Sequence, residues 1–294
     1  MNNYSQRSVK QAEKEVNLSK NCQKKRFSAF SLIEFAIVLT VVAVAVSGVM
    51  SLKVSDRKNS QMDKTNLRMA KINKAFEKFV LVNKRMPCPA SLQLTKRTTL
   101  TGVTDYGDEG GAPGECSDDG TYESSNPAHT HGLIYGAIPV RALGLPNNMA
   151  NDAYGERLIY IIDKEYTDSA TFATDDSTRR IIINDYNTSS LEVVASDVMF
   201  LIMSYGANKM GSFSASSTTQ NKLSSDIDEL YNGITIDSSA NTASFTNEFI
   251  KKTRRSGSKF DDILFYKSRK DFLISAKAEF VVNKNITSDS KLKP

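Results

Sequence analysis

The feature that most constrains this chain is one apolar run near its N-terminus. It covers Phe30 to Met50 and reads FSLIEFAIVLTVVAVAVSGVM, in which Glu34 is the only charged residue. As a helix it would be roughly 31 Å long, about the thickness of the hydrocarbon core of a bilayer. The chain contains no second run of this kind. The sequence therefore predicts a single-pass or signal-directed protein, although an ordinary signal peptide, with about 7–15 apolar residues, fits poorly.

The residues that follow the run predict a continuation of the same helix. Residues 51–86 contain neither Pro nor Gly. Their apolar side chains recur at helical spacing, while Lys and Glu occupy the opposite side. Pro87 favours an extended conformation for the residue before it, so we expect the helix to end near residue 84. The expected apolar stripe consists of Leu67, Met69, Ile72, Phe76, Phe79 and Val80.

Charge is distributed unevenly along the chain. The formal net charge is +5, and residues 1–29 account for all of it, because they hold seven Lys or Arg and two Glu. The rest of the chain is balanced, so we expect a basic leader and no nucleic-acid partner. Hydrophobic residues make up 40% of the sequence and charged residues 24%, which excludes a wholly disordered chain.

Residues 24–50 resemble the N-terminus of type IV prepilins and of type II secretion pseudopilins. Members of that family have a basic leader and a cleavage site, followed by an aromatic residue, a small polar residue, Leu, an aliphatic residue and Glu. Residues 30–34 of this chain read FSLIE. The resemblance implies cleavage between Ala29 and Phe30 by prepilin peptidase, N-methylation of Phe30, and assembly into a helical filament. The chain departs from the family in having Ala29 where Gly is usual and in the length of its leader, 29 residues.

Glu34 is the residue of the apolar run that most needs an explanation. A carboxylate in an apolar helix costs several kcal/mol unless it is paired, so Glu34 is a functional candidate. In the family that the run resembles, this carboxylate pairs with the N-terminal amine of a neighbouring subunit, which here would be the amine of Phe30. Two such charges compensate each other's burial only when they are in register. The alternative is a protonated or snorkelling Glu34 near a membrane edge.

The body of the chain contains two cysteines and a dense acidic segment. Cys88 and Cys116 suit one disulfide in an oxidising compartment, and two buried free thiols are the alternative. Residues 91–131 are rich in Gly and Asp, which predicts turns. The acids there form either a solvated loop or a calcium site. The calcium candidates are Asp105, Asp108, Asp118 and Asp119. We interpret His129 and His131 as surface residues rather than zinc ligands, and we expect no other cofactor.

From residue 132 onward the sequence predicts β structure. Short runs rich in Ile, Val, Tyr and Phe alternate with turn signals, and no long helix separates them, so an antiparallel sheet is favoured. The expected strands are Leu133–Val140, Arg157–Ile162, Arg180–Ile183, Val198–Ser204 and Asp262–Tyr266. With the helix stripe on one face, this sheet gives an α+β, pilin-like fold. We interpret residues 205–258 as a long surface excursion with one short helix at 222–231.

The expected organisation has six parts along the chain. They are a basic leader (1–29), a transmembrane or filament-core helix (30–50), an amphipathic helix (51–84), a disulfide-closed acidic loop region (85–131), an antiparallel sheet domain (132–280) and a polar tail (281–294).

The sequence predicts a structural protein rather than an enzyme. It has no G-x-S-x-G elbow, and Ser212 stands where a phosphate-binding loop needs Lys. We expect a pilin-like subunit, either a minor pilin or a minor pseudopilin, whose partners are other pilin or pseudopilin subunits, prepilin peptidase and the inner membrane. Its expected location is the inner membrane, with a cytoplasmic N-terminus and a periplasmic C-terminal domain. The alternative from another class is a membrane-anchored periplasmic binding module or hydrolase.

Overall fold

The computed structural model describes eight stretches of the chain. They are residues 32–95, 106–116, 121–124, 132–172, 181–187, 190–237, 242–253 and 256–277, and the side chains of 48–55 are not described. The chain divides into two compact units, Met1–Ser55 (unit 1) and Asp56–Pro294 (unit 2), and each is described by itself. The expected leader and the polar tail lie outside the described residues.

Helix α2 runs from Leu32 to Asn83, with residues in both units. It contains no proline and a single glycine, Gly48, so little in its sequence interrupts the helical hydrogen bonds. The helix ends where Lys84 adopts a left-handed conformation (φ 58°), and the N–H of Lys84 donates to the carbonyl of Val80 over 2.9 Å. Pro87 then favours an extended chain. This end agrees with the one expected near residue 84.

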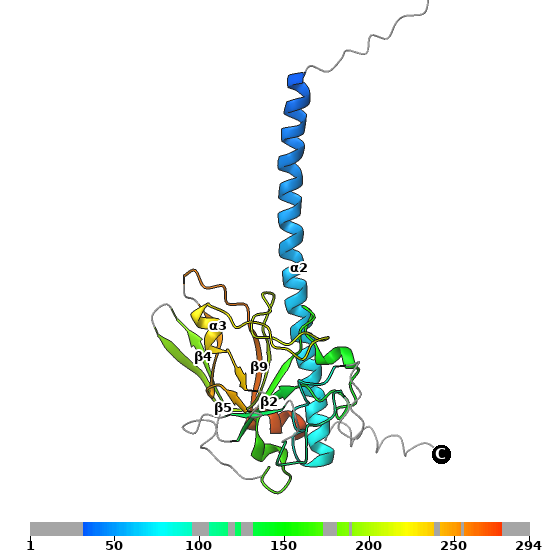
Figure 1. Ribbon diagram of the computed structural model, residues 1–294, viewed down its shortest axis with the longest axis vertical. Coiled ribbons are helices and arrows are strands. Elements are labelled where there is room, and N and C mark those ends of the chain that lie inside the picture. The colour runs from blue at the N-terminus through cyan, green and yellow to red at the C-terminus, as the bar shows by residue number, and fades with distance from the viewer. Residues whose placement is uncertain are drawn as a thin grey trace, which may run out of the picture. The chain divides into compact units, whose positions relative to one another are not determined.

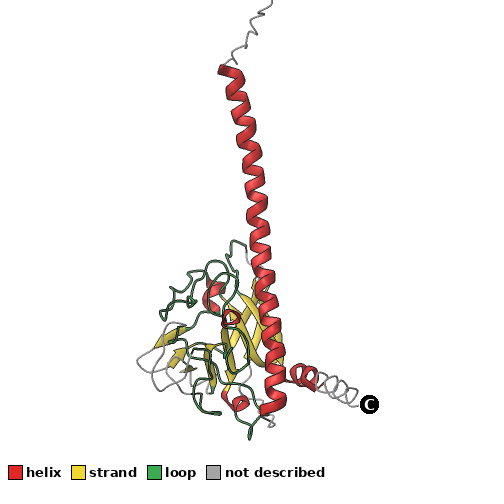
Figure 2. Ribbon diagram, turned by 90° about the vertical axis from the view of Figure 1, so that its right-hand side faces the viewer, coloured by secondary structure: helices red, strands yellow, loops and turns green. Residues whose placement is uncertain are grey.

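Unit 2 is built on one curled sheet of nine strands (Figure 1, Figure 2). Eight strands follow the order β6-β7-β1-β2-β3-β5-β4-β8, and β9 pairs with β5. The strands are β1 (Tyr122–Ser124), β2 (Leu133–Ala137), β3 (Ile159–Asp163), β4 (Ile181–Tyr186), β5 (Leu191–Ser204), β6 (Thr235–Asp237), β7 (Thr242–Ser244), β8 (Glu248–Thr253) and β9 (Ile263–Ser268). Short helical elements lie between them: η1 (Asn147–Ala150), η2 (Lys164–Thr167) and α3 (Ile227–Tyr231). Residues 269–277, after β9, are also helical.

The strand pairings overturn the expected pilin-like fold with its antiparallel sheet. β7 pairs with β1 in parallel, with Thr242 opposite Glu123, and β8 pairs with β4 in parallel, with Glu248 opposite Ile182. The sheet is therefore mixed, and it has more strands than the five that the sequence predicted. The physical cause lies in the chain after β5, which places β6 and β7 at one end of the sheet and β8 at the other.

The segment after β5 is not the surface excursion that its composition suggested. Phe213, Ile234, Phe245 and Phe249 are each at most 5% exposed and belong to one buried cluster with side chains of β2, β3 and β5. Strands of three residues, such as β6 and β7, are too short to show a recognisable alternation among polar neighbours. The prediction for residues 205–258 was therefore wrong in its main point.

Side chains on both faces of the sheet are buried, which explains the continuous apolar runs of its central strands. In β3, Tyr160 and Ile162 belong to the cluster that contains the α2 stripe, whereas Ile159 and Ile161 belong to the cluster on the opposite face. The ring of Phe76 in α2 lies 4.9 Å from the ring of Tyr160. The part of α2 in unit 2 therefore covers one face of the sheet.

Most of the predicted helix stripe is buried. The buried members, each at most 5% exposed, are Met69, Ile72, Phe76 and Val80. Leu67 is instead 57% exposed, and the ring of Phe79 lies 5.2 Å from the guanidinium of Arg85. Glu77 was expected on the solvated side, but it is buried and accepts a hydrogen bond from Asn73 Nδ2 over 2.8 Å.

The predicted disulfide is confirmed: Cys88 and Cys116 are bonded, with their Cα atoms 5.4 Å apart. A bidentate ion pair holds the enclosed loop at the end of α2, because Arg85 Nη1 and Nη2 lie 2.5 and 2.9 Å from the carboxylate oxygens of Glu109. The N–H of Cys88 also donates to Glu109, over 2.8 Å. A disulfide closing a loop of this length stabilises a fold by roughly 3–4 kcal/mol in the chain-entropy description.

The structure also corrects the expected membrane segment. Among the residues that it describes, no helix combines the length and the apolarity needed to cross a membrane. This finding contradicts the expected transmembrane helix and the expected single-pass, inner-membrane location.

Replacing Phe76 by Ala should lower the free energy of unfolding by about 3–5 kcal/mol, because the substitution opens a cavity between α2 and the sheet. Val82 lies on the same helix and is 80% exposed, so Val82→Ala should change that free energy by no more than about 0.5 kcal/mol. Urea denaturation followed by circular dichroism measures both. Equal effects of the two substitutions would contradict the packing described above.

Candidate functional site

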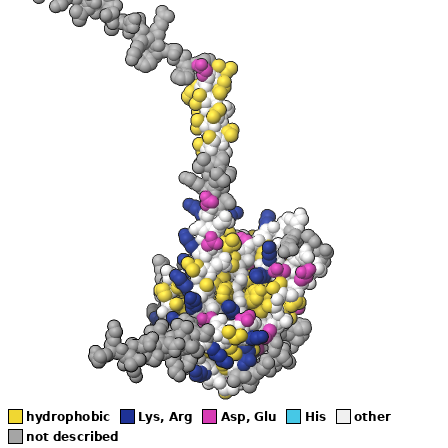
Figure 3. Space-filling view, turned by 180° about the vertical axis from the view of Figure 1, so that it is seen from behind, with side chains coloured by type: hydrophobic (Ala, Val, Ile, Leu, Met, Phe, Trp, Pro, Cys, Tyr) yellow, Lys and Arg dark blue, Asp and Glu magenta, His cyan; other side chains and the backbone are white. Residues whose placement is uncertain are grey.

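The strongest candidate site is the stretch of α2 from Leu32 to Ser47, here named the apolar segment. Every side chain in it is exposed, and its hydrophobic side chains are visible in Figure 3. The large ones expose between 45% and 89% of their surface. They are Leu32, Ile33, Phe35, Ile37, Val38, Leu39, Val41, Val42, Val44 and Val46. Contiguous apolar surface of this kind marks an interaction site.

The hydrophobic side chains of the apolar segment surround the helix axis instead of forming one stripe. Residues nine positions apart lie on opposite sides of a helix with 3.6 residues per turn. Leu32 and Val41 form one such opposed pair, and Phe35 and Val44 form another. A helix that is hydrophobic all round is one that is buried on all sides in its functional state. A single partner helix would cover only one side of this segment.

The hydroxyl groups of the apolar segment have hydrogen-bond partners within the helix. Thr40 Oγ1 donates to the carbonyl of Ile37, and Ser47 Oγ donates to the carbonyl of Ala43, each over 2.8 Å. Both hydroxyls are therefore satisfied within the helix. Glu34, in the first turn, is the one charged side chain of the segment. Burial of the segment would remove water from this carboxylate, so its charge would have to be compensated.

The structure places only some of the other predicted site residues. Asp108 forms an ion pair with Arg141 (Nη1 to Oδ2, 3.2 Å), so a cation of the protein itself already neutralises this calcium candidate. Several predictions fall outside the described residues: the processing site at Ala29 and Phe30, the calcium candidates Asp105, Asp118 and Asp119, and the histidines His129 and His131.

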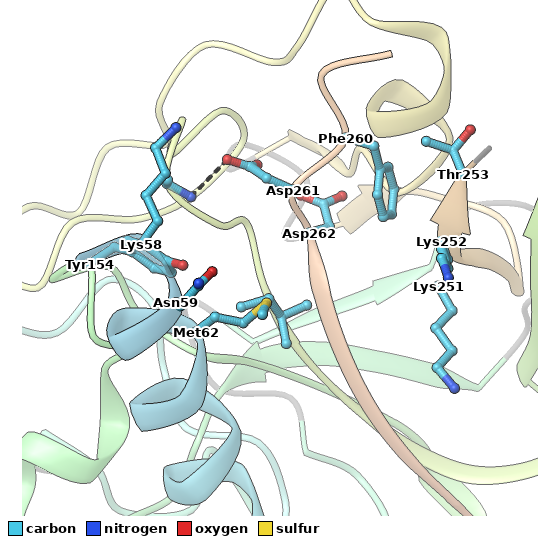
Figure 4. A pocket seen from close by; sticks show the side chains of 12 residues that line it. Lys58, Asn59, Met62, Tyr154, Lys251, Lys252, Thr253, Phe260, Asp261 and Asp262 are labelled. Carbon is cyan, nitrogen blue, oxygen red and sulfur yellow. Dashed lines mark hydrogen bonds between the residues drawn. The ribbon is translucent and has the colours of Figure 1, made fainter. Parts of the chain in front are cut away.

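A second candidate, which the sequence did not reveal, lies in unit 2 just before β9. Asp261 and Asp262 line a cavity of about 430 Å³ together with Lys58 and Phe260 (Figure 4). A neighbouring cavity of about 530 Å³ also reaches Asp261. Carboxylate oxygens of Asp261, Asp262 and Glu229 all lie within 4.8 Å of one another. These three residues are named the carboxyl cluster.

Hydrogen bonds rather than ion pairs hold the carboxyl cluster. Asp261 Oδ2 accepts the N–H groups of Ala207 and Asn208 over 2.9 and 3.0 Å. Asn232 Nδ2 donates to Asp262 Oδ2 over 2.9 Å. Within the described part of the chain, no Lys or Arg lies within ion-pair distance of Asp261 or Asp262. The Lys251 side chain extends away from them (Figure 4), and its ammonium lies over the ring of Tyr266.

The pKa values of two members of the carboxyl cluster, Asp261 and Asp262, are raised. Burial, with the nearby charge of Glu229 as a smaller cause, raises the pKa of Asp261 to about 6 against the hydrogen bonds from Asn208 and Ala207. Burial also raises the pKa of Asp262 well above its ordinary value. Because the protonated forms of Asp261 and Asp262 carry no charge to attract a cation, the carboxyl cluster does not by itself define a metal site. A carboxyl with a pKa near 6 can exchange protons close to neutral pH.

Comparisons with known proteins do not place the chain in a family. No protein family, no curated protein and no solved structure matches it. Its function must therefore be inferred from its own residues and their geometry.

The Asp261 carboxyl should make the protein less stable as the pH rises. Its folded pKa, about 6, exceeds the ordinary 3.8, so the folded state binds this proton more tightly than the unfolded state. Its stabilising contribution is complete below about pH 4 and is lost as the pH rises to about 6. The difference in unfolding free energy between the natural protein and Asp261→Asn, measured by urea denaturation, should fall across this range.

Asp226, the N-cap of α3, is a matched control of opposite sign. Burial raises its pKa, but hydrogen bonds from the backbone N–H groups of Lys259 and Asp228 outweigh it and leave the pKa below 3.8. Its contribution is therefore lost as the pH falls. The difference in unfolding free energy between the natural protein and Asp226→Asn should therefore shrink as the pH falls. If Asp226→Asn and Asp261→Asn showed the same pH trend, the opposite pKa shifts described for the two carboxyls would be wrong.

Proposed function

We propose that this chain is a structural subunit of a filament of the type IV pilus or type II secretion pseudopilus class. In this proposal, prepilin peptidase cuts between Ala29 and Phe30, and the apolar segment then packs among the same segments of other subunits. The observation that carries the proposal is that the apolar segment is exposed and hydrophobic on all sides in the single chain. An assembly of helices that surrounds the segment removes this surface from water.

The apolar surface can supply much of the free energy that assembly requires. The helix leaves between 45% and 89% of each large hydrophobic residue exposed, and burial of that remainder contributes on the order of 1 kcal/mol per residue. Ten such residues offset a substantial share of the 4–15 kcal/mol that association costs in lost freedom of motion, by rough estimates. Contacts with several neighbours in a filament add to this contribution, because each neighbour covers a different side of the helix.

Glu34 sets the register of the helices in this proposal. Cleavage creates an α-amine at Phe30, one turn from the Glu34 carboxylate in sequence. Two opposite charges that lose water in the same apolar layer compensate each other only when they meet. Packing in which the amine of one subunit faces Glu34 of another is therefore favoured over packing in which the two helices are shifted along their axes. The order FSLIE, which resembles the start of mature pilins, supports this assignment.

Charges placed in the apolar segment should prevent assembly. The double substitution Val41→Lys/Val44→Lys puts ammonium groups on exposed positions of the helix, where they leave the fold of unit 2 unchanged. The fraction of protein that sediments as filaments should fall by more than roughly tenfold, because burying one unpaired ammonium costs several kcal/mol. Val82→Lys, on an exposed position of the same helix in unit 2, is the control and should assemble normally. Equal assembly of both variants would overturn the proposal.

Removing the Glu34 carboxylate should separate processing from assembly. Glu34→Ala should still be cut between Ala29 and Phe30, as judged by mass spectrometry, but the cut chain should fail to enter filaments. Asp63→Ala removes an exposed carboxylate from the same helix and should change neither step. Incorporation of Glu34→Ala at the natural level would show that Glu34 does not set the register.

A further inference from the structure

One face of α2 in unit 2 carries a row of exposed lysine side chains. Its members, here named the lysine row, are Lys64, Lys71, Lys74 and Lys78. Residues seven positions apart on a helix differ in direction by about 20°, so Lys64, Lys71 and Lys78 follow one line along α2. Within the described part of the chain, no carboxylate lies within ion-pair distance of the row. Like charges four residues apart, such as Lys74 and Lys78, destabilise a helix, so a negatively charged partner would stabilise this face.

A hydrophobic side chain lies within the lysine row. Leu67 is three residues after Lys64 and four residues before Lys71, which places it on the same face of the helix. It is 57% exposed, whereas Ile72 and Phe76, on the side that faces the sheet, are fully buried. The lysine row therefore suits a partner that presents a small hydrophobic surface flanked by carboxylates.

The disulfide-closed loop of this chain presents a surface of that kind at the turn Ala112–Glu115, here named the loop turn. Its exposed residues are Ala112, Pro113 and Glu115. The N–H of Gly114 donates to Thr167 Oγ1 over 3.2 Å, which brings the turn next to the half-exposed Asp168. Among the residues that the structure describes, no Lys or Arg lies within ion-pair distance of Glu115 or Asp168. The loop turn thus combines an apolar Ala-Pro pair with carboxylates that no basic side chain neutralises.

Contacts inside the chain hold the loop turn in place. The carbonyl of Ala112 accepts the N–H groups of Glu115 and Cys116 over 3.1 and 3.0 Å. The disulfide at Cys116 and the ion pair between Arg85 and Glu109 tie the same loop to the end of α2. A surface that is already formed in the single chain loses little conformational freedom when it docks, which favours binding.

We propose that the loop turn of one copy of this chain docks on the lysine row of the next copy. Pro113 then packs against Leu67, while Glu115 and Asp168 lie among the ammonium groups of the row. The contact rests on the proposed function, because it names the surfaces that join the subunits of the proposed filament. It is a head-to-tail contact between two different surfaces, and contacts of that class build open helical assemblies when the rotation between copies does not close a ring.

Charge complementarity selects a second copy as the partner. Two other carboxylates of the loop, Asp108 and Glu109, already pair with arginines of their own copy. Glu115 and Asp168 have no such pair, so they are available to a neighbour. A single exposed ion pair contributes little by itself, and the contact therefore depends on several lysines acting together around Leu67.

The positions of the two surfaces along α2 fix the displacement between copies. Arg85, just after the helix, holds the loop, whereas Lys71 lies near the middle of the lysine row. At about 1.5 Å per residue, these positions are roughly 20 Å apart along the helix axis. Two copies whose helices run in the same direction therefore meet in this way when one is displaced by roughly 20 Å, and the displacement repeats from copy to copy.

Cysteine cross-linking tests which surfaces meet. Full-length chains that carry Cys22→Ser and either Leu67→Cys or Pro113→Cys are expressed together with prepilin peptidase, and sedimented filaments are treated with a mild oxidant. A disulfide-linked dimer should form in filaments that contain both chains and not in filaments of either chain alone. As the control, Met62→Cys replaces Leu67→Cys and should give no dimer, since Met62 is 43% exposed but points about 140° away around the helix.

Charge reversal tests the role of the lysine row. Each of two paired substitutions should lower the fraction of protein in filaments severalfold, and a chain that carries both pairs should recover it, because the charges are then exchanged across the contact. The two pairs are Lys71→Glu/Lys74→Glu and Glu115→Lys/Asp168→Lys. Lys222→Glu/Lys259→Glu, at exposed positions outside both surfaces, is the matched control and should assemble as the natural chain does.

The outcomes separate this contact from the filament itself. A natural chain that forms no filaments would overturn the proposed function and this contact with it. Three results in filaments that form normally would overturn the contact alone. They are the absence of a dimer in the mixture of the two cysteine chains, an equal dimer with Met62→Cys, and charge reversals that the combined chain does not rescue.

Discussion

The burial of hydrophobic side chains along a single helix is the interaction on which the rest of the structure depends. In unit 2, one hydrophobic stripe of α2 packs against the sheet, and residues such as Phe76 are completely buried. In unit 1, the same helix is hydrophobic all round and its described side chains remain exposed. The first pattern is satisfied within one chain, and the second is typical of a helix that is covered on all sides. The filament subunit proposed above, which folds alone and then assembles through its N-terminal helix, would account for both patterns.

Polar contacts between distant segments hold the loops of unit 2 on this hydrophobic framework. Arg157 is fully buried, donates to the carbonyl of Leu92 over 2.7 Å, and lies 5.8 Å from the ring of Tyr106. Asn232, also fully buried, joins the end of α3 to β8 and to the carboxyl of Asp262. Both polar atoms of the Asn232 side chain have hydrogen-bond partners, whereas Nε of Arg157 has none. These contacts join loops that are far apart in the sequence to the strands of unit 2.

Local patterns in the sequence predicted local structure well, and contacts between distant segments were not predictable. β2, β3, β4, β9 and the second half of β5 coincide with predicted strands, because buried strands read as continuous hydrophobic runs. The exposed first half of β5 was missed because LEVVASD mixes polar and hydrophobic residues. The parallel pairings of β7 and β8 depend on where a long segment crosses the sheet, which no local spacing encodes. The carboxyl cluster was missed for the same reason, since Glu229 and Asp261 meet only through the fold.

The proposed filament requires that the leader is removed and that the apolar segment then becomes the buried part of an assembly. The most direct measurement is the intact mass of the chain recovered from sedimented filaments after co-expression with a prepilin peptidase. We expect a mass corresponding to residues Phe30 to Pro294 with one added methyl group. An uncut chain, Met1 to Pro294, recovered as a monomer in the supernatant would contradict it.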